Sequence, residues 1–101
     1  MANAQNKYEQ AMTGSGEETL SIAYQFNTTQ ITINGLATGT ATIRAKAKGG
    51  DVLETVDGGT LDLTSERTIT ITDTSLEQLG VTVSAGTAYT LIVRQADKKY
   101  S

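Results

Sequence analysis

The side chains that come nearest to a catalytic motif are those of Asp73, Thr74 and Ser75. Aspartic proteases can be dimers of short chains, in which each subunit contributes one carboxylate to a shared pair. The glycine that such an Asp-Thr-Gly turn requires is absent, because Ser75 stands in its place. The tripeptide therefore predicts the N-terminal cap of a helical turn over residues 75–79, before Gly80, and no catalytic residue.

Acidic side chains are concentrated between residues 51 and 77, where Arg67 is the single basic residue. Two carboxylates on a sugar cleft would serve a glycosidase, but the chain has no tryptophan to form a sugar platform. Calcium prefers such oxygen ligands, yet their spacing matches no calcium-binding loop. We therefore expect these carboxylates at solvated strand ends, and we predict no catalytic residue, no metal ligand and no cofactor.

The residue types that the chain lacks exclude further chemistry. It has no Cys and no His, and so no Cys/His zinc site, no Ser-His or Cys-His nucleophile pair and no redox dithiol. Its 8 basic and 11 acidic residues give a formal charge of -3, which disfavours nucleic-acid binding because phosphate contacts need a basic face. No apolar run is long enough to cross a bilayer. The sequence therefore predicts a protein that is not an enzyme and has no nucleic-acid or membrane partner.

From Leu20 onward, apolar and polar residues alternate with the period of a β-strand. Glycine-containing turns separate these short runs, which recur at a spacing of roughly 8 to 12 residues. The alternation is cleanest over residues 40–48, which we expect to be one amphipathic strand. The predicted core consists of Leu20, Ile22, Tyr24, Ile31, Ile33, Ile43, Ile69, Ile71, Val81, Val83, Leu91 and Val93.

This pattern predicts an all-β protein, namely an antiparallel immunoglobulin- or fibronectin-like β-sandwich of about seven strands with an extended N-terminal arm. A small closed barrel is the alternative. A chain of 101 residues makes one domain. On this interpretation residues 1–17 form the arm and its hinge, residues 18–95 the sandwich, and residues 96–101 a C-terminal tail.

The arm holds the first group of candidate partner-binding residues, which are spaced like one face of a helix. They are Ala4, Tyr8, Ala11 and Met12. An isolated helix this short is marginal in water, so we expect it to order by docking on a partner. A frayed polar tail is the alternative interpretation.

The second candidate group consists of the cations Arg44, Lys46 and Lys48, which share one face of the predicted strand. Exposed ion pairs contribute only about 0 to 1 kcal/mol each. The stripe is therefore either a solvated strand face or a surface that meets acidic residues of the same chain or of a neighbouring subunit.

Two stretches carry a resemblance to known families. The segment ITINGLATGTATIR, from Ile31 to Arg44, resembles the strand, Gly-Leu loop and strand of fibronectin-like and immunoglobulin-like sandwiches, with Ala41 where such modules often place a tyrosine. Over residues 20–95, the succession of GLATGTATIRAKAKGG, VDGGTLDL, SLEQLGVTVSAG and AYTLIVRQ is similar to small immunoglobulin-like structural proteins of tailed bacteriophages. The resemblance implies a virion component without enzymatic activity, such as a head decoration, a head fibre, or a tail or baseplate accessory protein.

We therefore expect a virion structural protein that binds other virion proteins and forms a homo-oligomer or part of a symmetric assembly. Its first residues lack the basic and apolar parts of a secretory signal, so we expect it to be made in the host cytoplasm and to reside in the virion. The alternative function is a carbohydrate-binding or adhesin module. That function requires an exposed cluster among the aromatic residues, which are Tyr8, Tyr24, Phe26, Tyr89 and Tyr100.

Overall fold

The computed structural model describes residues 5–35 and 38–96 of the chain. Within these ranges the protein consists of eight strands and contains no helix. The strands are β1 (Gln5–Met12), β2 (Glu18–Ser21), β3 (Thr28–Asn34), β4 (Thr40–Ala47), β5 (Glu54–Asp62), β6 (Thr68–Ile71), β7 (Leu76–Val83) and β8 (Tyr89–Ala96). The predicted all-β class is thereby confirmed.

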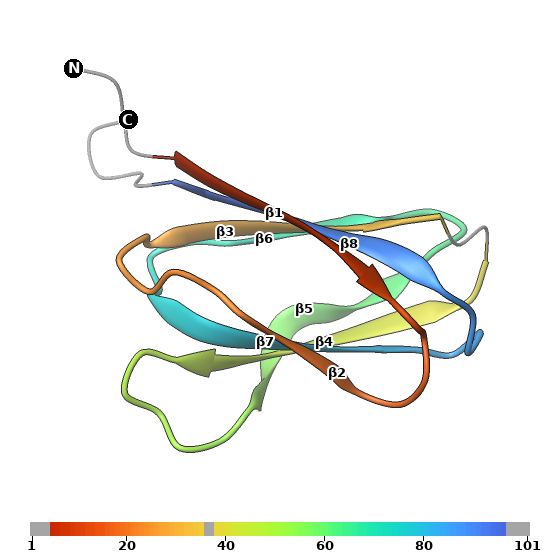
Figure 1. Ribbon diagram of the computed structural model, residues 1–101, viewed down its shortest axis with the longest axis horizontal. Helices are drawn as coiled ribbons and strands as arrows, with labels where there is room; N and C mark the ends of the chain where they lie inside the picture. The colour runs from red at the N-terminus through yellow and green to blue at the C-terminus, as the bar shows by residue number, and fades with distance from the viewer. Residues whose placement is uncertain (1–4, 36–37, 97–101) are drawn as a thin grey trace.

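The strands form two antiparallel sheets that lie one above the other (Figure 1). The first sheet has the order β1-β8-β3-β6 and the second has the order β2-β7-β4-β5. Strand one pairs with eight, two with seven, three with six and four with five, as if one long hairpin had been folded over on itself. Two four-stranded sheets connected in this way are a jelly roll.

The predicted β-sandwich is confirmed, whereas the predicted immunoglobulin- or fibronectin-like strand order is not confirmed. An immunoglobulin constant-type sandwich divides seven strands into one sheet of four and one of three. Here each sheet has four strands, and the first strand of the chain pairs with the last one. Alternation of apolar and polar residues indicates that strands exist, but it is the same whichever strands pair, so it could not distinguish the two topologies.

The core lies between the inner faces of the two sheets, where side chains alternate between buried and exposed along β3 and β4. Nine of the twelve predicted core residues are buried: Ile22, Ile31, Ile33, Ile43, Ile69, Val81, Val83, Leu91 and Val93. Leu20 and Ile71 are partly buried at the flanks of the sandwich. The prediction is wrong for Tyr24, whose side chain is 51% exposed because the chain turns after β2 instead of continuing the alternation.

Residues 5–12 form an edge strand of the first sheet, so the predicted helical face is wrong. β1 pairs with β8 at eight consecutive positions, and this satisfies backbone hydrogen bonds that a short isolated helix would not retain in water. Tyr8 and Met12 point toward the second sheet, and Met12 is in the core with 5% of its surface exposed. A separate N-terminal arm is therefore not confirmed, and Ala4 lies outside the described residues.

The predicted helical turn over residues 75–79 is also wrong, because this segment is the beginning of β7. Leu76 and Leu79 are both buried although they are three residues apart. A register shift in the pairing with β4 leaves one residue of β7 extra at Glu77. A bulge of this kind turns both leucines inward and thereby produces the spacing that suggested a helix.

Candidate functional site

The acidic residues that were considered as catalytic candidates do not form one cluster. Some of them hold loops in place. Across residues 5–35 and 38–96, no group of three acidic side chains is placed to hold a metal ion. Asp62 accepts hydrogen bonds from the backbone N–H and the hydroxyl of Thr64, at 3.1 and 2.7 Å, and so turns the chain after β5. Asp73 lies in the loop after β6 with a φ of 58°. The described residues also contain no helix that could span a membrane.

The free edge of β1 is the most regular unpaired surface of the sandwich. β1 has eight residues and keeps an unbroken register with β8. Of the other edge strands, β2 and β6 have four residues each, and the pairing of β5 with β4 is interrupted. No strand in the described part of the chain pairs with the second side of β1. Backbone N–H and C=O groups of alternate residues of β1 are therefore available to another chain.

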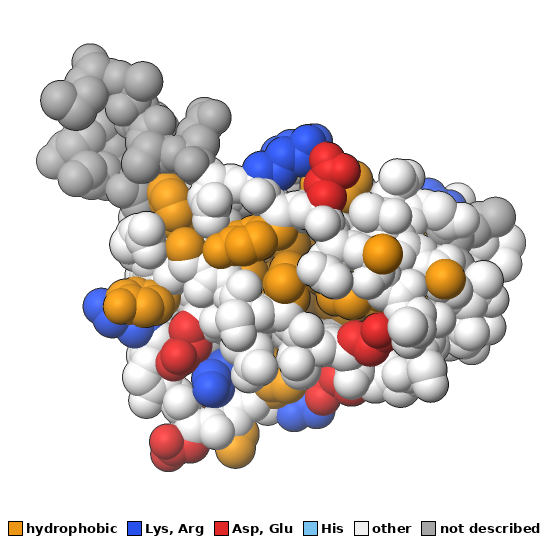
Figure 2. Space-filling model, viewed as in Figure 1, with side chains coloured by type: hydrophobic (Ala, Val, Ile, Leu, Met, Phe, Trp, Pro, Cys, Tyr) orange, Lys and Arg blue, Asp and Glu red, His pale blue; other side chains and the backbone are white. Residues whose placement is uncertain are grey.

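An apolar flank runs beside this edge, between the edge strands of the two sheets. Tyr8 of β1 and Leu20 of β2 are each half-buried and pack against the core. Figure 2 shows hydrophobic side chains in the middle of this face, between the positions of β1 and β2. We call the free edge of β1 together with Tyr8 and Leu20 the β1/β2 flank.

On its outer face β1 carries two opposite charges next to each other. The ammonium group of Lys7 lies 2.9 Å from Oε1 of Glu9, and both side chains are more than half exposed. The hydrogen bond and the charge of Lys7 lower the pKa of Glu9 below its ordinary value. This pair is accessible from the free edge of β1 because the two residues alternate with Tyr8, which faces inward.

A depression of about 430 Å³ lies on the outer face of the first sheet, beside β1. It is lined by a row of polar side chains that crosses all four strands, one residue from each. The row consists of Lys7, Arg94, Gln30 and Thr70. These side chains can donate and accept hydrogen bonds, and two of them carry positive charge.

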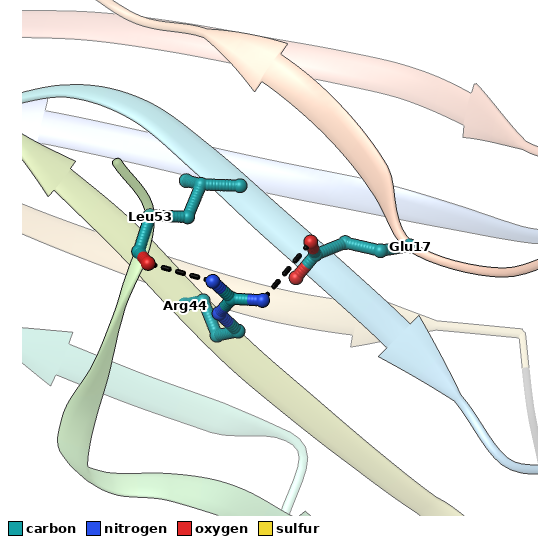
Figure 3. Close-up of polar contacts among 3 residues, drawn as sticks. All are labelled: Glu17, Arg44 and Leu53. Atoms are coloured by element: carbon teal, nitrogen blue, oxygen red, sulfur yellow. Dashed lines mark hydrogen bonds and ion pairs between the residues drawn. The ribbon is translucent and has the colours of Figure 1, made fainter. Parts of the chain in front are cut away.

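Arg44 is engaged within the chain on the outer face of the second sheet (Figure 3). Its guanidinium donates a hydrogen bond to the backbone carbonyl of Leu53 at 2.6 Å and lies 3.3 Å from Oε1 of Glu17. Gly80 lies opposite Arg44 on β7, where a Cβ atom would come within 2.9 Å of the Leu53 side chain. Arg44 therefore holds the loops that precede β2 and β5 against the outer face of the second sheet.

The other two predicted cations do not complete a free basic surface. Lys46 is half-buried on β4. The ammonium group of Lys48 lies 5.0 Å from the ring centroid of Tyr24, within the range of a cation–π contact. Arg44 and Lys46 thus lie on β4, whereas Lys48 follows the end of the strand, and both Arg44 and Lys48 interact with other parts of the same chain.

The structure separates the residues that were grouped on the supposed helical face. Tyr8 reaches the β1/β2 flank, Met12 enters the core, and Ala11 is exposed on the outer face. Lys7 and Glu9 were not among the predicted site residues. Their alternation with Tyr8 has the two-residue period of a β-strand, which is the signal that could have identified them. Of the aromatic residues, Phe26 and Tyr89 are buried, Tyr8 packs against the core, and Tyr24 is exposed beside Lys48. Tyr100 lies outside the described residues.

The chain matches no protein-family model and no curated protein sequence. Its fold is similar to that of the SPBc2 prophage-derived protein YomS, with a TM-score of 0.64 and 13% identity over 96% of both chains. It is also similar to a protein of Bacillus endospore appendages, described as disulfide-linked pili, with a TM-score of 0.53 and 14% identity over 95% of this chain and 89% of the other. The core of Drosophila NLP gives a TM-score of 0.52 and 15% identity over 91% and 98%. At these identities the likeness shows a shared fold.

Proposed function

We propose that this chain is a non-enzymatic structural protein of a bacteriophage virion, a head decoration or a tail or baseplate accessory, which binds other virion proteins through the β1/β2 flank. The observation that carries the proposal is the long, regular and unpaired edge of β1 beside a half-buried apolar strip. Such an edge binds another chain through main-chain hydrogen bonds, and neighbouring apolar side chains add affinity and specificity.

Two of the fold comparisons support this setting. One of the similar structures is prophage-derived, and its likeness extends over 96% of both chains. Another belongs to appendages described as disulfide-linked pili. The present chain has no cysteine, so contacts between its copies are expected to be non-covalent.

The test is the presence of the chain in purified particles made by the host that carries its gene. We expect wild-type protein to migrate with particles in a density gradient and Tyr8→Gln to be depleted from them. Tyr24→Gln is the matched control, because Tyr24 is exposed and its ring lies beside Lys48. Wild-type protein that stays at the top of the gradient with free protein, although circular dichroism shows it to be folded, would contradict the proposal.

Carbohydrate binding is the second candidate function, and the depression on the first sheet favours it. Its row of Lys7, Arg94, Gln30 and Thr70 offers hydrogen bonds to sugar hydroxyl or carboxylate groups. None of these side chains is aromatic, so the depression lacks the stacking surface that sugars commonly use. Saturable glycan binding that Arg94→Ala abolishes would favour this candidate over the virion proposal.

A further inference from the structure

We infer that the free edge of β1 binds β1 of a second copy of this chain in antiparallel orientation, with the two-fold axis midway between the Tyr8 residues of the two copies. The inference rests on the proposed function, because it names a partner for the same β1/β2 flank. The two first sheets would then join into one continuous eight-stranded sheet.

The alternation of side chains restricts the possible registers. Two antiparallel strands of one sheet are related by an axis perpendicular to that sheet, so the inner faces of both copies lie on the same side. Residues directly opposite each other must then both point inward or both point outward. The axis must therefore lie midway between two copies of the same residue of β1. Every register that places an inward-pointing residue opposite an outward-pointing one is excluded.

The charges of Lys7 and Glu9 select one of these registers. An axis at Lys7 places two lysines opposite each other, and an axis at Glu9 does the same with two glutamates. An axis at Tyr8 places Lys7 of each copy opposite Glu9 of the other, which gives two attractive pairs. Opposite charges across antiparallel strands are stabilising and like charges directly opposite are destabilising. The strand is thus complementary to itself only when the axis lies midway between the two Tyr8 residues.

The same register covers the apolar flank. With the axis midway between the two Tyr8 residues, their rings meet on the inner side of the joined sheet, next to Leu20 of both copies. These side chains are half-buried in the single chain and pack against its core. Their mutual burial removes apolar surface from water, and an aromatic pair adds to this contribution.

Most of the features that prevent edge pairing are missing from β1. Edge strands are commonly blunted by proline, bulges, short length or charged side chains, and β1 has only the charges of Lys7 and Glu9, which are opposite in sign. β1 contains no proline, keeps a regular register over eight residues, and has Asn6, Tyr8, Gln10 and Met12 on its inner face. By contrast, β2 and β6 are short and β5 is interrupted by a bulge.

Charge reversal tests the register in the full-length chain. Analytical ultracentrifugation should show a concentration-dependent dimer for the wild type. Lys7→Glu and Glu9→Lys should each raise the dimer dissociation constant by about tenfold or more, since each turns two attractive pairs into repulsive ones. An equimolar mixture of the two variants should recover dimer, because the all-acidic strand then faces an all-basic one. Glu54→Lys, on exposed β5, is the control and should dimerise like the wild type.

A single cysteine tests the position of the axis, since the chain has none of its own. Tyr8→Cys should form a disulfide-linked dimer on oxidation, because opposite Cβ atoms lie about 4.5 to 5.5 Å apart across antiparallel strands. Gln10→Cys, two residues along on the same face, should not, because its opposite residue is Asn6 of the second copy. Equal cross-linking of the two variants would place the axis elsewhere and overturn the inference.

Two further results would overturn the inference. One is a wild-type chain that stays monomeric, and the other is a mixture of the two charge variants that dimerises no better than either variant alone. The outcomes separate the two proposals. A monomer that migrates with particles refutes the dimer and leaves the proposed function standing. A dimer with the predicted charge dependence that is absent from particles supports this inference and refutes the proposed function.

Discussion

Gln95 is a buried polar side chain that ties three parts of the chain together. Only 2% of its surface is exposed, although it lies on the inner face of β8. Its amide donates a hydrogen bond to the carbonyl of Ala23 at 2.8 Å and accepts one from the Ala23 N–H at 3.3 Å. It also accepts one from Asn6 of β1 at 3.3 Å. Gln95 therefore joins β8 to β1 and to the loop between β2 and β3.

Gln95→Leu should lower the free energy of unfolding by about 1 to 3 kcal/mol, because it leaves the Ala23 backbone groups without their partner. Urea denaturation measures this change. Gln25→Leu is the matched control, since Gln25 is exposed, and it should change stability by less than about 0.5 kcal/mol. Equal effects of the two substitutions would show that the amide of Gln95 contributes nothing specific.

Glu18 organises the loop between β1 and β2. Its carboxylate accepts hydrogen bonds from the backbone N–H and hydroxyl of Thr13, at 2.9 and 3.1 Å, and from the N–H of Gly14 at 2.7 Å. The backbone of Thr13, with further hydrogen bonds from this loop, lowers the pKa of Glu18 below its ordinary value of 4.5. Nearby, burial together with the charge of Glu18 raises the pKa of Tyr89 to about 12.

The lowered pKa of Glu18 makes stability depend on pH in a defined direction. The ionised group stabilises the fold above its ordinary pKa of 4.5, and this contribution is lost as the pH falls through the lowered folded-state value. Glu18→Gln should therefore melt at a lower temperature than the wild type near pH 7, and the gap between the two melting temperatures should narrow as the pH falls below 4.5. A gap that stays constant over this range would refute the assigned role.

At the scale of elements, the turn that leaves β1 depends on Gly14. Its φ of +80° is in the left-handed region, and a Cβ atom there would collide with the backbone carbonyl of Thr87, in the loop before β8. Gly16 in the same turn has a φ of +66° but open space around it.

Both substitutions to alanine add left-handed strain, which costs about 1 to 2 kcal/mol. Gly14→Ala should destabilise the protein clearly more than Gly16→Ala, because only Gly14 also meets backbone atoms. Thermal unfolding of the two variants side by side measures the difference. Similar melting temperatures would mean that the close approach to Thr87 is not a constraint.

The elements that the sequence predicts well are those that follow one period without interruption. Strand β4 is an example, because Ala41, Ile43 and Ala45 are buried and alternate with half-exposed residues. The bulge at Glu77 shifts Leu76 and Leu79 to a helical spacing, although the segment is part of β7. Bulges break the period locally, so periodicity alone misassigns the segments that contain them.

The candidate surface was less predictable than the strands. The size and spacing of Tyr8 predict a partner-binding residue, but on a helix, whereas the structure places Tyr8 on strand β1. Lys7 and Arg94 are 87 positions apart in the sequence and become neighbours only through the register of β1 with β8. Such neighbours follow from strand order, which alternation does not determine.

At the scale of the whole molecule, β1 is part of the cooperative unit. It contributes Met12 to the core and pairs with β8 over its full length. A chain that begins at Thr13 should therefore unfold at markedly lower denaturant concentration than the full chain. Met12→Ala in the full chain should cost about 2 to 5 kcal/mol, and exposed Ala11→Ser should cost little. Wild-type stability of the shortened chain would show that residues 5–12 are a dispensable arm.

Amide hydrogen exchange of β1 at several protein concentrations tests the central claim most directly, namely that β1 is an edge strand whose free side binds a second copy. Alternate amides of β1 face β8 and should be protected at every concentration. The amides between them face outward and should become protected only as the concentration rises, whereas the outward amides of edge strand β6 should not change. Fast exchange along all of β1, or outward amides that stay unprotected at the highest concentration, would contradict the account.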